Sequence, residues 1–98
     1  MFGSVYSMKP LPGQEANIAA HFRRWERERR PEVGGAVGGY VLRPRGNPGE
    51  LIGVTVFDSE ESYKNNANDP AQNQWFQDLR AMLETDPEWK DGDVLVAL

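Results

Sequence analysis

The sequence predicts an α+β fold in which four strands and two long helical stretches follow one another in the order βαββαβ. Three observations support this order. Short runs rich in β-branched and aromatic residues recur along the chain. Longer segments carry apolar residues at helical spacing, and clusters of proline, glycine and asparagine separate the two kinds of segment. A chain of 98 residues has the size of one domain, so residues 1–98 are expected to form a single unit.

The first strand and the first helix lie at the start of the chain. FGSVYSM at 2–8 is rich in strand-forming residues, and the KPLPG that follows it ends the strand. An amphipathic helix is predicted at 14–30, where Pro31 stops it. At about 100° per residue, one side of this helix carries Gln14, Ile18, His21, Phe22, Trp25 and Arg29.

A hairpin is predicted next. The glycine-rich segment at 32–44 contains enough strand formers to be a strand, and its glycines suggest a bulge or a close approach of another backbone. LIGVTVF at 51–57 is the clearest strand in the sequence. The turn residues at 43–50 therefore join two antiparallel strands.

A short helix follows the hairpin. Asp58 or Ser59 can act as its N-cap, with Glu61 placed to reach back to the cap. The helix is expected to end near Asn66, in a run of asparagines that tolerate helix-terminal conformations.

The second long helix and a last strand complete the chain. Asp69 can cap this helix with Pro70 in its first position, and the Asp-Pro pair at 86–87 is expected to close it. Its apolar side carries Gln72, Trp75, Phe76, Leu79, Met82 and Leu83. DGDVLVAL at 91–98 ends in a continuous apolar run, which is interpreted as a buried fourth strand.

These elements give the ferredoxin-like arrangement, a four-stranded antiparallel sheet with its helices on one face. The other face should be polar in a monomer, but Ile52, Val54 and Val56 make both faces of 51–57 apolar, and VLVAL at 94–98 is also apolar throughout. Leaving about six such side chains in water would forgo about 9 kcal/mol, as much as a typical domain's stability. We therefore expect an obligate homodimer that packs through its sheet faces.

Composition argues against several classes of function. A formal net charge of −4 disfavours nucleic-acid binding, which needs a net basic surface. The basic run at 21–30 is interleaved with glutamates, so it indicates a solvated helix face or, alternatively, a site for an acidic ligand. The absence of cysteine excludes disulfides and thiol nucleophiles. No apolar stretch approaches about 18 residues and no signal-peptide pattern is present, so we expect a cytoplasmic protein without a membrane partner.

Two passages carry a resemblance to a known family. VYSMKPLPGQEANIAAHFRRW at 5–25 is similar to the first strand, Pro-Gly turn and first helix of antibiotic-biosynthesis-monooxygenase-type domains. VTVFDSEESYKNNAND at 54–69 is similar to their third strand and the helix start after it. The chain thus resembles this group of the dimeric α+β barrel superfamily over essentially its whole length. The resemblance implies a homodimer in which two sheets enclose a barrel-like core.

The same resemblance implies a class of chemistry. The group includes cofactor-free oxygenases that act on aromatic polyketides, in which the substrate's own electron-rich ring reacts with oxygen inside an apolar cavity with a few polar groups. It also includes haem-degrading enzymes, which use a histidine on the second long helix. PAQNQWFQDLRAMLETD at 70–86 has no histidine, which disfavours haem degradation.

His21 is the only histidine and lies at the edge of the apolar side of the first helix. It is a candidate proton-transfer group, and the alternative is a half-buried helix residue with a satisfied hydrogen bond. One histidine without clustered ligands gives no metal signature, and we expect neither a metal nor a cofactor.

Five further residues are candidates for the site. Tyr6 and Trp25 can line a pocket for a flat aromatic ligand, or pack in the core. Arg29 can hold an anionic substrate or pair with a carboxylate of the protein. Asn65 can bind substrate and Asn66 can take part in catalysis, or both can cap the short helix.

Two functions follow from these observations. The first is a homodimeric, cofactor-independent monooxygenase acting on a small aromatic or polyketide-like substrate. The second is a non-catalytic dimer of the same fold that binds a small hydrophobic ligand or a partner protein.

Overall fold

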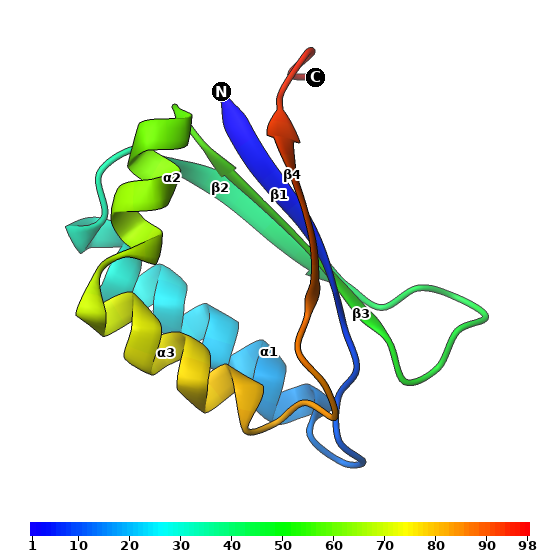
Figure 1. Ribbon diagram of the computed structural model, residues 1–98. Helices are drawn as coiled ribbons and strands as arrows, with labels where there is room; N and C mark the ends of the chain where they lie inside the picture. The colour runs from blue at the N-terminus through cyan, green and yellow to red at the C-terminus, as the bar shows by residue number, and fades with distance from the viewer.

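The computed structural model describes residues 1–98 and has two layers, a four-stranded sheet and a set of helices that cover one of its faces (Figure 1). All strand pairs are antiparallel, and the strand order is β2-β3-β1-β4. The predicted α+β, ferredoxin-like fold is confirmed. In chain order the elements are β1 (Phe2–Met8), α1 (Glu15–Arg24), a π-helical turn η1 (Trp25–Arg29), a 3₁₀ turn η2 (Arg30–Glu32), β2 (Ala36–Leu42), β3 (Leu51–Phe57), α2 (Glu60–Ala67), α3 (Pro70–Arg80) and β4 (Glu88–Asp93).

The two central strands have the predicted bounds. β1 and β3 pair along their whole length, from Phe2 opposite Phe57 to Met8 opposite Leu51. Because side chains alternate between the faces of a strand, these four residues all point toward the helices. The core beneath the helices contains Tyr6, Met8, Ile18, Leu51, Leu79 and Leu83.

The first helical stretch has the predicted extent but changes its winding twice. α1 ends at Arg24, and the backbone N–H of Arg30 then bonds to the carbonyl of Trp25, which closes a wider π turn. A 3₁₀ turn containing Pro31 ends the stretch. Helical periodicity places residues on a side of a helix, but it does not reveal a change of winding inside it.

Side-chain caps begin the other two helices. Ser59 caps α2 by accepting a hydrogen bond from the backbone N–H of Ser62 at 3.1 Å. Asp69 caps α3 by accepting from the N–H of Ala71 at 2.9 Å, and Pro70 is the first helical residue. Both caps confirm the sequence prediction, with Ser59 and not Asp58 in the capping position.

The end of α3 differs from the prediction. The helix stops at Arg80 and not at the Asp-Pro pair at 86–87. The chain beyond it pairs with the loop after β1, where Leu11 N–H donates to Met82 O at 2.9 Å and Glu84 N–H donates to Lys9 O at 2.8 Å. These long-range hydrogen bonds replace helical ones, and local sequence does not reveal them.

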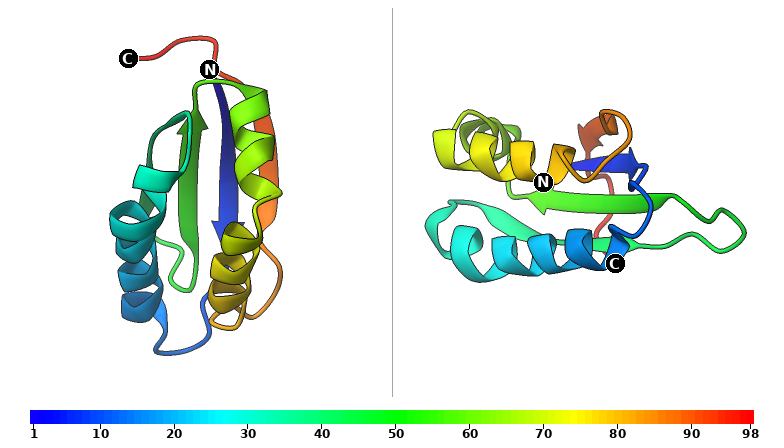
Figure 2. Two further views of the ribbon diagram at one scale, coloured as in Figure 1. Left: turned by 90° about the vertical axis from the view of Figure 1, so that its left-hand side faces the viewer. Right: turned by 90° about the horizontal axis from the view of Figure 1, so that it is seen from below.

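The prediction of a fourth strand at 91–98 was wrong in its bounds. β4 begins at Glu88, and its last pair joins Asp93 to Phe2. The N–H of Val94 bonds to Met1 O. The apolar residues that follow pair with no strand, and Leu95 is 92% exposed. In Figure 2 this segment turns away from β4 and runs across the end of the sheet.

The sheet face opposite the helices is apolar, as predicted from the sequence of the third strand. Val54 lies at its centre, opposite Val5 of β1 on one side and Tyr40 of β2 on the other. Tyr40 is 77% exposed, and Val5 is exposed as well. We call this surface the outer face; its apolar members are Val5, Tyr40, Leu42, Ile52, Val54 and Val56.

None of the helices combines the length and apolar character needed to cross a membrane.

Candidate functional site

A cavity of about 1580 Å³ is lined by residues of both layers. It extends to residues of the outer face and to the segment after β4, so it is open and not enclosed. Its volume exceeds the roughly 300–1,000 Å³ of a typical ligand pocket. Additional polypeptide would have to cover the opening before this cavity could bury a small ligand.

One wall of the cavity is aromatic. The ring of Tyr6 lies 4.7 Å from Trp89 and 6.4 Å from Phe22, measured between centroids, and Phe22 meets Trp75 edge to face at 5.0 Å. Phe76 continues the row at 6.1 Å from Trp89. All five rings line the cavity. Aromatic rings stack favourably on flat aromatic surfaces, so this wall suits a planar ligand.

Polar groups of the sheet lie beside the aromatic wall. The Tyr6 hydroxyl is hydrogen-bonded to Thr55 Oγ1 at 3.0 Å, and Ser4 Oγ donates to Asp91 Oδ1 at 2.6 Å. Tyr63 from α2 donates to the same carboxylate oxygen at 3.4 Å. Burial raises the pKa of Tyr6, and it also raises the pKa of Tyr63, because each ring is partly removed from water. Both tyrosines are therefore neutral phenols at neutral pH.

The side-chain amides of Asn66, Gln72 and Asn73 from α2 and α3 also line the cavity. Asn66 of α2 accepts a hydrogen bond through Oδ1 from Arg29 Nη2 at 3.0 Å. Gln72 of α3 accepts through Oε1 from Trp25 Nε1 at 2.7 Å. Arg29 and Trp25 occupy the two ends of the π-helical turn η1.

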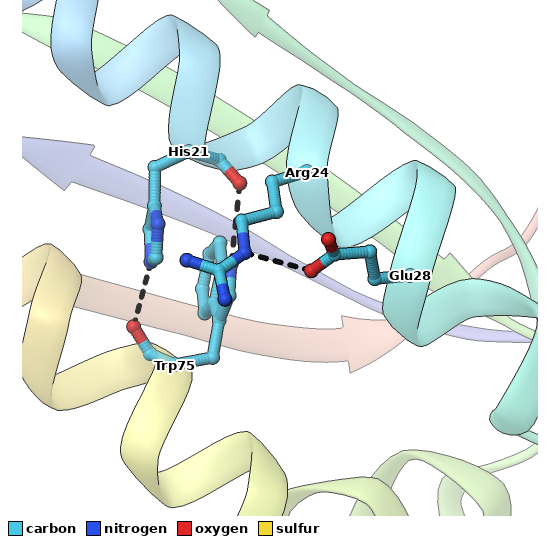
Figure 3. Close-up of polar contacts among 4 residues, drawn as sticks. All are labelled: His21, Arg24, Glu28 and Trp75. Carbon is cyan, nitrogen blue, oxygen red and sulfur yellow. Dashed lines mark hydrogen bonds and ion pairs between the residues drawn. The ribbon is translucent and has the colours of Figure 1, made fainter.

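His21 lies between helices and does not line the cavity. Its Nε2 lies 2.8 Å from the carbonyl oxygen of Trp75, and Trp75 Nε1 donates to the carbonyl oxygen of His21 at 3.2 Å (Figure 3). The two rings are stacked with centroids 4.6 Å apart. Because a carbonyl oxygen only accepts, the proton of the neutral ring lies on Nε2. These contacts join α1 to α3, and the geometry corresponds to the alternative of a buried, satisfied histidine.

The other predicted residues divide between the cavity and its surroundings. Tyr6, Trp25 and Asn66 line the cavity together. Arg29 lies behind it, 15% exposed in its side chain, with Nη2 3.5 Å from Asp69 Oδ2. Asn65 is exposed and lies outside the cavity. Of the six candidate residues named from the sequence, three line this one cavity.

Several cavity residues were not singled out from the sequence as site residues. The sequence places Gln72 on the apolar side of the second long helix, and in the structure its amide bonds to Trp25. Asp91 and Trp89 share the helix-facing side of β4, opposite Ser4 and Tyr6. If the start of the fourth strand had been predicted correctly, the alternation of side chains along it would have placed both residues on this side.

No group of three or more His, Cys, Asp or Glu side chains is placed to hold a metal ion. The groups that line the cavity can stack against a ring, donate hydrogen bonds to its oxygens and accept a proton on a carboxylate.

No protein-family model matches the sequence, and curated protein sequences include no significant relative of it. Solved structures do match. SnoaB, a cofactor-independent oxygenase from Streptomyces nogalater, is 17% identical with a TM-score of 0.81, over 99% of this chain and 95% of that one. An antibiotic biosynthesis monooxygenase is 10% identical with a TM-score of 0.77, over 98% of this chain and 100% of the other. A conserved protein from Methanosarcina mazei is 15% identical with a TM-score of 0.80, over 93% and 89% of the two chains.

These similarities confirm that the chain has the α+β fold of antibiotic-biosynthesis-monooxygenase-like proteins, as the resemblance in the sequence implied. At 10–17% identity the likeness is one of fold. A shared fold does not establish a shared activity, which depends on the groups in the site.

Proposed function

We propose that the protein is a cofactor-independent monooxygenase that acts on a small aromatic, polyketide-like substrate. The observation that carries the proposal is the cavity itself, in which a row of aromatic rings lies beside a few hydrogen-bonding groups. Chemistry driven by the substrate's own electrons needs little else from a protein: an apolar site, orientation of the ring and stabilisation of its anion.

The reaction that fits an anthrone-type substrate converts a ring CH2 into a carbonyl. The ring carbon loses a proton to a base, the resulting anion transfers electrons to O2, one oxygen atom stays on the carbon and the other leaves as water. The protein must accept the first proton and stabilise the negative charge that spreads onto the ring oxygen.

Asp91 is the proton acceptor that we propose for this step. It lines the cavity two residues after Trp89 on the same side of β4, and Ser4 and Tyr63 donate to its Oδ1, which leaves Oδ2 for a substrate proton. His21, predicted as the proton-transfer group, contacts the backbone of Trp75 instead. We assign it the role of holding Trp75 in the aromatic wall.

Asp91→Asn tests this assignment, because the amide keeps an oxygen for Ser4 but removes the carboxylate. Oxygen uptake with anthrone- and quinol-type substrates should fall roughly 10²- to 10⁴-fold, while binding of the product quinone should change little. His21→Ala is the comparison and should keep most of the turnover measured at a temperature where it is folded. An Asp91→Asn protein that consumes oxygen at the wild-type rate contradicts the assignment of the base.

The second candidate function is binding of the same class of ligand without turnover. It is favoured by the mutual hydrogen bonding of the polar groups, since Tyr6 is bonded to Thr55 and Ser4 to Asp91. Such pairs can serve stability alone. Tight binding of anthrone-type compounds with no oxygen uptake by the wild-type protein would establish this alternative and exclude the oxygenase.

A homodimer is part of the proposal. The outer face is apolar and a second copy of it is self-complementary through a two-fold axis. The cavity also reaches the outer face and the segment after β4, so a second copy would narrow its opening. Sedimentation equilibrium at micromolar concentration should give twice the chain mass of 11.1 kDa.

A further inference from the structure

The two ends of the π-helical turn η1 bond to two of the three cavity amides, Gln72 and Asn66. Trp25 at its first position bonds to Gln72, and Arg29 at its last position bonds to Asn66. π-Helical turns are rare in proteins, and those that occur are often found at functional sites. In an uninterrupted α-helix these two residues, four apart, would be stacked one turn above the other. The wider turn changes the angle between them, and here they reach two different helices.

The chemistry of the two donors determines which end of each amide faces them. Arginine and the indole N–H of tryptophan have no acceptor atom. The oxygen of each amide must therefore point at η1, at 3.0 Å for Asn66 and 2.7 Å for Gln72. Each oxygen is engaged by a donor of the protein, which leaves the NH2 groups as the free ends of both amides.

Arg29 is held firmly enough to fix this orientation. Its side chain is only 15% exposed, and Nη2 also lies 3.5 Å from Asp69, the residue that caps α3. Its Nε is buried and has no hydrogen-bond partner, so its charge is only partly compensated. A largely buried cation behind the oxygen of Asn66 polarises the amide and strengthens the N–H donors at its other end.

We propose that η1 determines whether the cavity amides present hydrogen-bond donors or acceptors to a ligand. Arg29 and Trp25 act as positioning residues that turn Asn66 and Gln72 so that both amides donate hydrogen bonds to a ligand oxyanion, such as an ionised phenol or enol. This inference rests on the proposed aromatic-binding function. Two N–H donors stabilise an anion more than its protonated form, so a bound phenol ionises at a lower pH than the free one.

Alizarin is a suitable probe because it is flat, carries phenols and changes its visible absorption on ionisation. The spectrum of bound alizarin, recorded against pH, should show ionisation at lower pH than in buffer. Asn66→Asp keeps an oxygen for Arg29 but removes the donor. Bound ionisation should move to higher pH, and affinity for the phenolate should fall roughly 10- to 100-fold. Arg29→Met and Trp25→Phe should shift the ionisation in the same direction, and Arg29→Lys should restore part of the change.

The matched control is Asn65→Asp, which makes the same charge change at the neighbouring position, where the side chain is exposed and outside the cavity. It should leave the ionisation of bound alizarin where the wild type has it. Anthracene, which has no oxygen, should bind the Asn65, Asn66 and Arg29 variants as it binds the wild type, and so reports on whether the cavity is intact. Circular dichroism identifies any variant that is unfolded, and Arg29→Lys then replaces Arg29→Met as the test of that position.

The outcomes separate the two proposals. If neither alizarin nor anthracene binds the wild type, the aromatic-binding function and this inference are both overturned. If alizarin binds but ionises at the same pH in the wild type, Asn66→Asp and the Arg29 variants, only the inference about η1 is overturned.

Discussion

Replacing Val54 with aspartate should dissociate the proposed dimer while leaving the protomer folded. Val54 lies in the middle of the outer face, opposite Val5 on β1 and Tyr40 on β2. Its side chain points away from the helices and the core, so the protomer loses little packing. Two-fold symmetry places the substitution in the interface twice.

The magnitude follows from this geometry. Removing one buried valine from an interface costs at least about 1.5 kcal/mol, and the two copies together cost about 3 kcal/mol. That corresponds to more than a 100-fold rise in the dissociation constant. Two carboxylates brought close together in an apolar interface add a desolvation cost on top of this value.

Sedimentation equilibrium over a concentration series measures the effect, and urea unfolding followed by circular dichroism reports on the protomer. Leu11→Asp is the matched control, because Leu11 is an exposed apolar residue in the loop after β1, away from the outer face. It should leave the dimer unchanged. A Val54→Asp protein that dimerises with the wild-type dissociation constant would refute the outer face as the interface, and a monomeric wild type would refute the dimer itself.

Three further predictions concern single contacts. His21→Ala removes the stacking and hydrogen bonding with Trp75 and should lower the free energy of unfolding by about 1–3 kcal/mol, measured in urea; an unchanged midpoint would show that the contact contributes nothing. Asp69→Ala removes the cap of α3 and should cost about 1 kcal/mol in the same assay, and Asp69→Asn should recover most of it. The pKa values of Tyr6 and Tyr63 are raised above the ordinary 10.0 in the folded protein, so the unfolded state loses these protons first as pH rises. The contribution of these two groups to stability should be constant below pH 10 and should fall above it; replacing both tyrosines by phenylalanine should flatten the decline in stability above pH 10, and a decline of unchanged slope would contradict the assignment.

The sequence was sufficient wherever a short-range rule applies. The alternation in LIGVTVF placed one set of β3 side chains toward the core and the other on the outer face. Asp69 and Pro70 marked the start of α3, because a capping carboxylate and a residue without an N–H suit a helix N-terminus in any context. The expected homodimer stays a prediction that depends on the same alternation.

Polar side chains were harder to place. His21, Arg29 and Asn66 share a region, but only Asn66 reaches the cavity. Which donor meets which acceptor depends on the separation of α1, α2 and α3, and helical periodicity carries no information about that distance. Gln72 is the clearest case, since nothing in the local sequence indicates that its partner is Trp25, 47 residues away.

The sequence by itself determined the order of the elements, the caps of the helices and the apolar character of both sheet faces, because each depends on residues close together in the chain. Only the tertiary structure decided where β4 ends, where the helical winding widens and which side chains face the cavity. The last residue pair of β4 with β1 joins Asp93 to Phe2, and the N–H of Val94 bonds to Met1 O. The apolar run from Leu95 to Leu98 has strand-forming residues but no strand beside it, and pairing with a neighbour is what turns such a sequence into a strand.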